Sequence, residues 1–368
     1  MREVQCAAAV YDVVADGILG FSPHPLGLSR ASRSPLAVWA RVLGAEGCGA
    51  RLSFAARRDG WFGTLPSGVR TLLDKERAAA LWAFGAAQRQ VTEMVDLGVR
   101  VMLLKGAARA MARVDKPSER GFADVDVLVS AADAQRVHKQ LRERLRYVPR
   151  YGACRRHLAP LQRTGYLPVE LHLRLGNGQR EEAALTNGMW EQATGEPVAI
   201  PSATHLLLHT LVHATDVDWA MPYRLRDVAD VATAIAAGAD LDVVDRFAAV
   251  SSDPAVVATL VAAALSTGTP GRELARVRRV GRARAMGAVA ADRPELANRL
   301  LCYAGLAAAA SPRGLRRVVS SFCDRHCGQI ATRQGHTIGP IYRTGANMRS
   351  TGPFAGQAPC LDSGGESS

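Results

Sequence analysis

The chain has 368 residues, of which 48% are hydrophobic, and its formal net charge is +12. This length and apolar content allow a sizeable core and predict about two domains. No apolar run approaches the ~20 residues that a membrane-spanning helix needs, and the N-terminus lacks the plan of a signal peptide. The seven cysteines are scattered and odd in number, which suits reduced thiols. We therefore expect a cytoplasmic protein with no membrane span.

The positive charge is unevenly distributed along the chain. Residues 272–349 hold 15 Arg, no Lys and 4 acids, which gives +11 and leaves +1 for the remainder. Such a region could contact RNA, an acidic partner or a membrane surface, or it could be an ordinary solvated surface. Cys323, His326 and Cys327 cluster within it, but their spacing fits no common zinc module.

The chain divides into four predicted segments. Residues 1–70 carry glycine, proline and serine breaks and predict a mixed or helical segment, with short helices packed on the next unit. Residues 71–200 form a predicted core of strands and helices, and residues 201–320 a helical domain. Residues 321–368 are poor in apolar positions and predict a poorly ordered basic tail.

The predicted core begins with a long helix over residues 71–97, which has apolar side chains near helical spacing and which Gly98 ends. A buried strand over residues 100–104 and a short alanine-rich helix over residues 106–114 follow. After a loop, residues 124–129 alternate acids with aliphatic side chains, which is typical of a half-buried strand.

The remaining elements are predicted from caps, turns and periodicity. Ser130 predicts the N-cap of a helix over residues 130–145, and residues 147–149 predict a short edge strand. Residues 154–163 and 167–175 predict a hairpin. In the helical domain, after an N-cap at Ser202, helices are expected over residues 204–214, 223–236, 243–249 and 255–264.

The acidic strand carries the strongest chemical signal in the chain. Asp124 and Asp126 point to one face, roughly 7 Å apart at their Cα atoms, while Val125, Val127 and Val129 point into a core. Adjacent carboxylates repel each other unless a cation lies between them. Because Mg²⁺ prefers carboxylate oxygens, the pair predicts a magnesium site and phosphate chemistry.

Two later polar residues could join this site. Glu170 and His172 alternate with aliphatic residues and therefore share one face of their predicted strand. If that strand lies beside the acidic strand in register, Glu170 supplies a third carboxylate and His172 lines the pocket. His205, His209 and His213 share one helix face, where they could bind zinc or, as a packed stripe, line a substrate pocket.

Six motifs follow one another along the chain: Leu103-Leu104-Lys105-Gly106, Arg120, the run Asp124–Val129, Val169–His172, the stripe His205–His213, and Arg226-Asp227-Val228-Ala229. Together they resemble the nucleotidyltransferase superfamily, with its DNA polymerase beta-like fold, and within it the bacterial family of uncharacterised nucleotidyltransferases. The likeness covers roughly residues 70–240. It implies an α+β fold in which a mixed β-sheet with flanking helices precedes a helical region.

The resemblance implies transfer of a nucleoside monophosphate from an NTP to an unidentified hydroxyl acceptor, with release of pyrophosphate. Asp124, Asp126 and Glu170 would be the catalytic and metal-binding residues, holding two Mg²⁺ ions. The acceptor could be a small molecule, a protein or an RNA. Lys105, Gly106, Arg113 and Arg120 would bind the nucleotide phosphates, and Asp227 would line the cleft.

One departure from the superfamily pattern leaves other functions open. The superfamily has a Gly-Ser or Gly-Gly pair, but here Ala107 follows Gly106, so one group that normally holds the triphosphate is missing. Lys105 could bind phosphates or could instead form a salt bridge with the aspartates. The alternatives are an inactive binding protein that holds a partner or RNA through its basic C-terminal region, and an RNA-end modifier.

Overall fold

The computed structural model describes residues 2–98, 100–150, 157–175, 180–217, 223–251, 253–269 and 271–290. The predicted tail over residues 321–368 and the Cys323, His326 and Cys327 cluster lie outside these residues, as does most of the basic region. The predicted boundaries near residues 70, 200 and 320 stay predictions.

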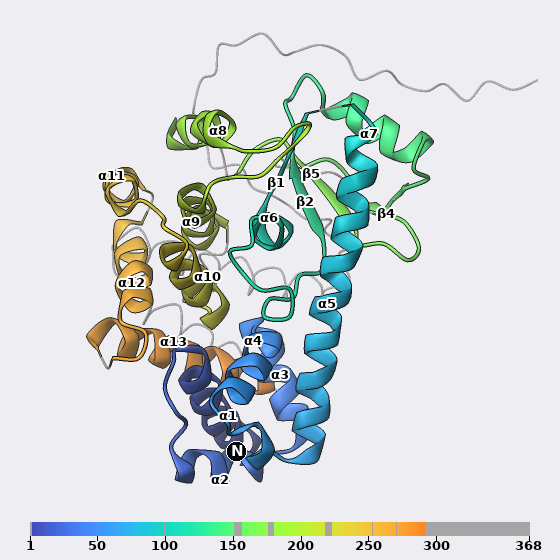
Figure 1. The fold of residues 1–368 in the computed structure, drawn as a ribbon. Helices are drawn as coiled ribbons and strands as arrows, with labels where there is room; N and C mark the ends of the chain where they lie inside the picture. The colour runs from blue at the N-terminus through green and yellow to red at the C-terminus, as the bar shows by residue number, and fades with distance from the viewer. Residues whose placement is uncertain are drawn as a thin grey trace, which may run out of the picture. The chain divides into compact units, whose positions relative to one another are not determined.

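A mixed β-sheet lies at the centre of the predicted core (Figure 1). Its six strands, in the part of the chain that the structure describes, have the order β3-β4-β5-β2-β1-β6. β2 runs parallel to β5 and antiparallel to β1, and β6 runs parallel to β1. The strands are β1 (Val101–Leu103), β2 (Val125–Leu128), β3 (Val148–Pro149), β4 (Leu161–Gln162), β5 (Val169–His172) and β6 (Val198–Ala199).

The two faces of the sheet are covered by different helices. Val125 and Val127 of β2 pack into one core with apolar residues of α5 (Ser67–Val95) and α7 (Ala134–Glu143). Leu128 of β2 belongs to a second core, which includes leucines of α9 (Ala203–Val212). Because side chains alternate along a strand, Asp126 lies on the face that α9 covers.

The helix α6 (Lys105–Met111) connects the sheet to both sets of helices, because it contacts β2, α5 and α9. It follows β1 directly, as expected from the sequence. The long predicted helix is confirmed as α5, and Gly98 adopts a left-handed φ of 64° just after its end. A left-handed residue after the last turn is a common way to end a helix.

The predicted helix over residues 130–145 begins later than expected. Its first helical residue is Ala134, and Ser130 is not the N-cap. The Ser130 hydroxyl instead accepts a hydrogen bond from the backbone N–H of Asp133, at 3.1 Å, and so forms a local turn. A serine hydroxyl can accept a hydrogen bond in a turn as readily as at a helix N-cap. The local sequence therefore does not decide between a turn and an N-cap at Ser130.

The predicted hairpin and edge strand are present in shorter form. β4 pairs antiparallel with β5 through Leu161 and Val169, across a turn in which Gly165 has a φ of 79°. β3 pairs antiparallel with β4 as the edge strand. The expected first strand also included residues 154–156, which lie outside the described residues. β6 has no counterpart among the predicted elements.

The remaining helices come from both ends of the described chain. Ser202 is the N-cap of α9, as predicted, since its hydroxyl accepts a bond from the N–H of His205. The N-terminal segment and the helical region contribute α1 (Arg2–Ile18), α2 (Pro25–Ser32), α3 (Leu36–Glu46), α4 (Gly49–Arg58), η1 (Phe62–Thr64), α8 (Arg180–Gln192), the π-helical turn η2 (His213–Val217), α10 (Leu225–Ala236), α11 (Leu241–Val250), α12 (Pro254–Leu265) and α13 (Arg272–Val289).

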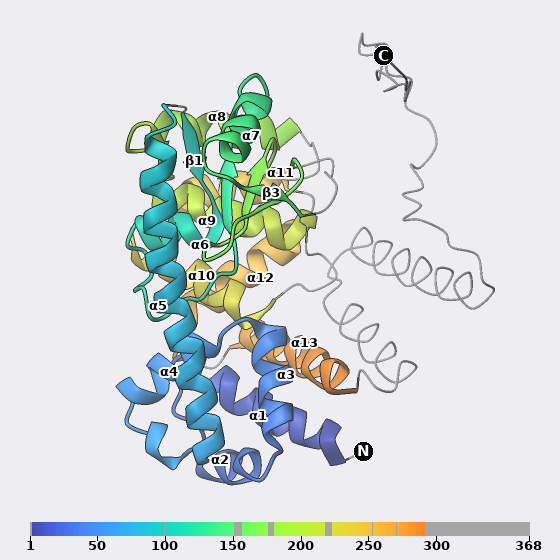
Figure 2. The same cartoon turned by 90° about the vertical axis from the view of Figure 1, so that its right-hand side faces the viewer.

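These helices share one core. α13 packs against α1 and α3, and α10 packs against α9 and α12 (Figure 2). The predicted α+β class, with a sheet core and a helical region, is therefore confirmed. Within the described segments, no helix is both long and apolar enough to cross a lipid bilayer.

Three arginines in the described part of the basic region pair with acids of the same chain. Arg278 and Arg282 of α13 pair with Asp16 and Asp12 of α1. Arg284 pairs with the fully buried Glu46 of α3, with 2.8 Å between Nη2 and Oε1. These ion pairs connect α13 to α1 and α3, and only the pair of Arg284 with Glu46 is fully buried.

Candidate functional site

The parallel register of β2 and β5 places the predicted acids side by side. Asp126 pairs with Glu170, and Leu128 pairs with His172. One potential ligand atom from each of Asp126, Glu170 and His172 lies within 4.8 Å of the others. The sequence could propose this convergence but could not fix the register, which the structure supplies.

Asp126 is the centre of this acidic cluster. Its side chain is 1% exposed, and its Oδ1 atom accepts bonds from Lys105 Nζ and His172 Nε2, each at 2.6 Å. Burial alone would raise the pKa of Asp126, but the positive charge of Lys105 and the His172 hydrogen bond hold it well below its usual range. Asp126 is therefore ionised at neutral pH.

The neighbours of Asp126 respond to its charge. Burial acts to lower the pKa values of Lys105 and His172, but their contacts with Asp126 raise both above the ordinary values. His172 also lies 3.7 Å from Glu170, measured from Nε2 to Oε2. These contacts make one connected group of two carboxylates, an ammonium and an imidazole.

Asp124 precedes β2 and adds a third carboxyl group. Burial, together with the negative charge of Asp126, raises its pKa to about 7. A bound cation would offset the repulsion between these neighbouring carboxyl groups. Oxygen donors in this arrangement fit a divalent cation such as Mg²⁺. Asp126 and Glu170 offer converging oxygens for it, and Lys105 supplies positive charge beside them. Asp124 does not belong to the described cluster whose ligand atoms all lie within 4.8 Å of one another.

Lys105 and Gly106 begin α6 under steric constraint. Lys105 has a left-handed φ of 46°, which is unfavourable for a residue with a side chain. A Cβ atom on Gly106 would lie 2.4 Å from Arg120 Nη1 and 2.5 Å from Phe122 Cβ. The glycine therefore gives room to the loop that carries Arg120, a role that the sequence did not indicate.

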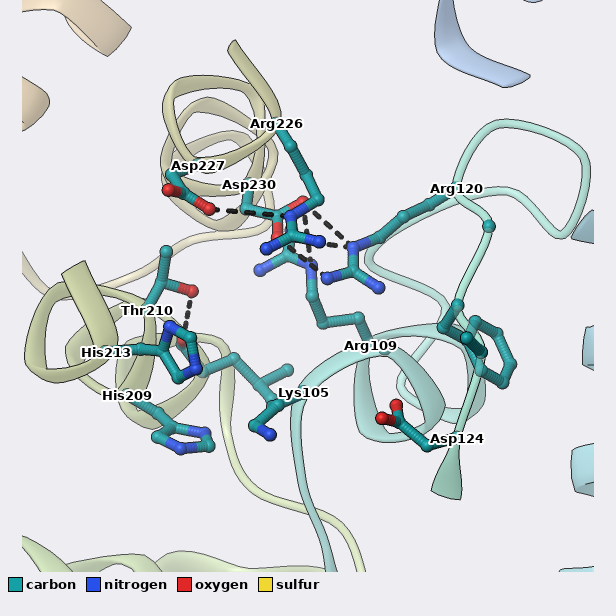
Figure 3. A pocket seen from close by; sticks show the side chains of 15 residues that line it. Lys105, Arg109, Arg120, Asp124, His209, Thr210, His213, Arg226, Asp227 and Asp230 are labelled. Atoms are coloured by element: carbon teal, nitrogen blue, oxygen red, sulfur yellow. Dashed lines mark hydrogen bonds and ion pairs between the residues drawn. The ribbon is translucent and has the colours of Figure 1, made fainter. Parts of the chain in front are cut away.

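A pocket of about 250 Å³ opens beside the acidic cluster, between α6, α9 and α10 (Figure 3). Five of the predicted site residues line it: Lys105, Gly106, Arg120, Asp124 and Asp227. Asp126, Glu170 and His172 are not among its lining residues. Lys105 connects the two places, because it lines the pocket and bonds Asp126.

The far end of the pocket from Asp124 contains a buried group of opposite charges. Arg51 Nη2 lies 2.7 Å from Asp115 Oδ1 and 2.8 Å from Asp230 Oδ1. Arg109 Nε donates to Asp115 Oδ2 at 2.7 Å. Arg120 contacts Asp230 through Nε at 3.0 Å and Nη2 at 3.0 Å. Arg120, predicted to bind phosphate, is thus already bound to a carboxylate.

Two other predicted residues have contrasting positions. Arg113 follows α6 at an exposed position with a left-handed φ of 57°, and it is not among the lining residues of the pocket. Asp227 lies in the first turn of α10, where Arg224 Nε approaches at 3.3 Å and Arg226 Nε at 3.5 Å. The structure brings Asp227 to the pocket and does not bring Arg113 there.

The histidine stripe of α9 divides between packing and the pocket. His205 bonds the Ser202 hydroxyl at 2.9 Å through Nδ1 and does not line the pocket. His209 and His213 do line it, and burial holds the pKa of His209 well below its ordinary value. Among the residues described, the stripe is not one of the groups able to share a metal ion. The packed, pocket-lining interpretation is favoured.

Sequence reasoning missed the cationic residues that come from other elements. Arg51 extends from α4 into the buried group of opposite charges formed with Arg109, Arg120, Asp115 and Asp230. It lies far from the motifs in sequence, and nothing in its local sequence indicates a role in the site. Arg226 was noted only as part of a motif, although its side chain lines the pocket. Arg109 lies one turn after Lys105, and this helical spacing was a weak signal for a shared face.

Comparisons with known proteins agree with this geometry. Residues 45–265 match the model of a family described as uncharacterised nucleotidyltransferase, and this span exceeds half of the chain. Neither the curated proteins nor the solved structures yielded a match. The matched span contains every strand of the described residues and the pocket that lies beside the acidic cluster.

Proposed function

Because the chain belongs to the family of uncharacterised nucleotidyltransferases, we propose that it transfers a nucleoside monophosphate from an NTP to a hydroxyl acceptor. In this reaction the acceptor oxygen forms a bond to the α-phosphorus, the bond to pyrophosphate breaks, and the hydroxyl proton passes to a base. The observation that carries the proposal is the register that sets Glu170 beside Asp126, next to a pocket that Asp124 and Lys105 line.

Magnesium is the cofactor that the carboxylates would hold. Asp124, Asp126 and Glu170 offer the oxygen donors, and Asp126 is already in its ionised form. Bound there, Mg²⁺ would neutralise phosphate charge and stabilise the attacking and leaving oxygens.

Three groups of this chain would do the remaining chemistry. The Lys105 ammonium, at the N-terminus of α6, lies at the pocket wall where phosphate oxygens would be attracted. Glu170 is only partly buried, with its side chain 17% exposed, and would accept the acceptor proton or complete the metal site. His172 donates to Asp126 and keeps that carboxylate oriented.

The non-catalytic alternative is less well supported. It depends on a basic C-terminal region that is free to hold a partner or RNA. In the described part of that region, Arg278, Arg282 and Arg284 are paired with acids of the same chain. A protein that only held a partner or RNA through its basic region would also make no use of the acidic cluster of Asp126, Glu170 and His172.

The direct test of the proposal is pyrophosphate release. The full chain is incubated with Mg²⁺ and each labelled NTP in turn, with cell extract as the source of acceptor. We expect one or more NTPs to release pyrophosphate, with the activity abolished by EDTA and by Asp126→Asn. Asp74→Asn, which removes an exposed carboxylate on α5, is the matched control and should leave the rate unchanged. Nucleotide binding without turnover, or full activity in Asp126→Asn, would contradict the proposal.

A further inference from the structure

We propose that Arg109 and Arg226, at the end of the pocket walled by α6 and α10, bind an oxyanion, a phosphate or carboxylate group, of a ligand that enters the pocket. Figure 3 shows these two side chains gathered with Arg120 around Asp230, apart from Asp124. Such a site would exist whether or not the protein transfers nucleotides.

The first argument is the charge balance of the buried network. Three guanidinium groups, those of Arg51, Arg109 and Arg120, meet two carboxylates, those of Asp115 and Asp230. Within the described residues this leaves one positive charge in excess, although all five side chains are at most 10% exposed. A buried charge without a counter-ion is costly, so an anion from the pocket would stabilise this arrangement.

The second argument is an unused donor on Arg109. This residue is 1% exposed and lines the pocket. Its Nε donates to Asp115 at 2.7 Å, and its Nη2 donates to the Thr233 hydroxyl. Its Nη1 has no hydrogen-bond partner in the described part of the chain. A buried charged donor that lacks an acceptor is destabilising, and a ligand oxygen would satisfy it.

The third argument is the position of Arg226. Its side chain is 29% exposed and lines the same pocket, so a ligand can reach it. Its Nε has no hydrogen-bond partner within the described segments, and Asp227 Oδ1 lies 3.5 Å from it. Asp227 is also shared with Arg224. Arg226 therefore offers a second fork of donors at the open side of the site.

The paired guanidinium groups define the class of ligand. A guanidinium presents a planar set of donors that matches the two oxygens of a carboxylate or phosphate. Lys105 and Asp124, by contrast, contribute an ammonium and a carboxyl group near the acidic cluster, where metal-bound phosphates would lie. The anionic group bound by Arg109 and Arg226 is either part of the nucleotide or part of a second substrate.

The test uses inorganic phosphate and, separately, acetate as probes of the full chain, without Mg²⁺ or nucleotide. Isothermal titration calorimetry should show saturable binding of at least one probe at constant ionic strength. Thermal unfolding should shift to higher temperature with the same probe, because a ligand that binds only the folded state stabilises it. Absence of saturable binding by both probes would overturn the proposal.

Two variants and a control locate the binding. Arg226→Ala, at the open side of the site, should weaken binding about tenfold or more, as expected for loss of charge-assisted hydrogen bonds. Arg109→Lys keeps the positive charge but loses the planar set of guanidinium donors. Provided that thermal unfolding shows this variant to be folded, it should bind phosphate more weakly. Arg136→Gln removes an exposed arginine on α7 and should bind the probe as the wild type does. Equal affinity in Arg226→Ala and the wild type would contradict the assignment.

A competition experiment identifies which ligand carries the anion. Titration of the same probe is repeated with a saturating non-hydrolysable NTP analogue. If the probe still binds, the site belongs to a second substrate with an anionic group. If the analogue displaces the probe, and Arg226→Ala weakens the binding of both the probe and the analogue, the site holds the phosphate tail of the nucleotide. Both outcomes keep the oxyanion site, and both are independent of turnover.

Discussion

At the scale of single residues, Asp126 and Gly106 illustrate how contacts decide roles. Lys105 and His172 converge on the same oxygen of Asp126, so the carboxylate is ionised and fixed before any ligand arrives. Gly106 keeps its place because the Arg120–Phe122 loop fills the space where a side chain would lie. Both residues are set by neighbours that are distant in sequence.

The role of Gly106 can be measured by adding one methyl group. Gly106→Ala would place a Cβ within 2.5 Å of Phe122 Cβ and should destabilise the protein by about 1–3 kcal/mol, as overpacking does. Urea unfolding followed by circular dichroism gives this value. Gly85→Ala is the control on α5, since its nearest neighbour is an arginine nitrogen 3.8 Å away. There we expect no loss and a gain of up to about 1 kcal/mol, and an equal loss in both variants would argue against the contact.

At the scale of elements, the buried network joins α4, α6 and α10 around the pocket. Burial alone would raise the pKa values of Asp115 and Asp230, but the arginines around them hold both below the ordinary value. The three elements therefore depend on these two carboxylates remaining ionised.

This network predicts a loss of stability in acid. Carboxylates with a depressed pKa in the folded state contribute stability that is complete above the unfolded pKa of about 4, because protonation then favours neither state. As the pH falls below that value, protons bind the unfolded chain first, and the contribution is lost. The free energy of unfolding, measured in urea, should therefore fall between about pH 5 and pH 2.

A variant assigns that pH dependence to the network. Asp230→Asn leaves buried arginines without one partner and should cost about 3–5 kcal/mol at pH 7. Its remaining stability should depend less on pH below 5 than that of the wild type. Asp74→Asn, with an exposed carboxylate, should keep the wild-type pH profile. An unchanged acid profile in Asp230→Asn would show that other groups govern acid unfolding.

The sequence predicted elements best where local signals were strong. The strand over 100–104 follows from a short apolar run, the strand over 124–129 from alternation, and the helix after Ser202 from capping, and all three signals are local. The start of α7 was wrong because Ser130 suits a turn as well as a cap. β6 has two residues and gains its order by pairing with β1, a contact that a local pattern does not carry.

In the candidate site, too, local patterns could be predicted from the sequence and contacts between distant segments could not. Asp124, Asp126 and Glu170 were proposed from period-two patterns, and the register of β2 and β5 places Asp126 beside Glu170. Arg51, Arg109 and Arg226 were not assigned to the site, because three separate helices must fold before they meet. Residue type alone is a poor guide among so many arginines.

At the scale of the whole molecule, residues from distant parts of the described chain pack into one hydrophobic core. The buried Glu46 of α3 accepts from the backbone N–H of Leu225 at the start of α10, at 2.9 Å. Its carboxylate also receives Arg284 of α13, at 2.8 Å. One carboxylate thus connects the N-terminal segment, the pocket wall and the last described helix.

Removal of Arg284 should therefore weaken the whole fold. Arg284→Met leaves Glu46 buried without its cation and should lower the free energy of unfolding by about 3–5 kcal/mol. Arg282→Met removes the cation of a more exposed ion pair, the one with Asp12, and should change the free energy of unfolding little. Urea unfolding of both variants makes the comparison, and equal stability of the two would mean that the buried pair does not hold α13.

The central claim is that Asp124, Asp126 and Glu170 together hold a divalent cation beside the pocket. The most direct measurement is a titration with Mn²⁺, as a paramagnetic substitute for Mg²⁺, followed by electron paramagnetic resonance in the presence of a non-hydrolysable NTP analogue. We predict saturable binding to the wild type, competition by Mg²⁺, and loss of binding in Asp126→Asn and Glu170→Gln. Undiminished Mn²⁺ binding in both folded variants would contradict the claim.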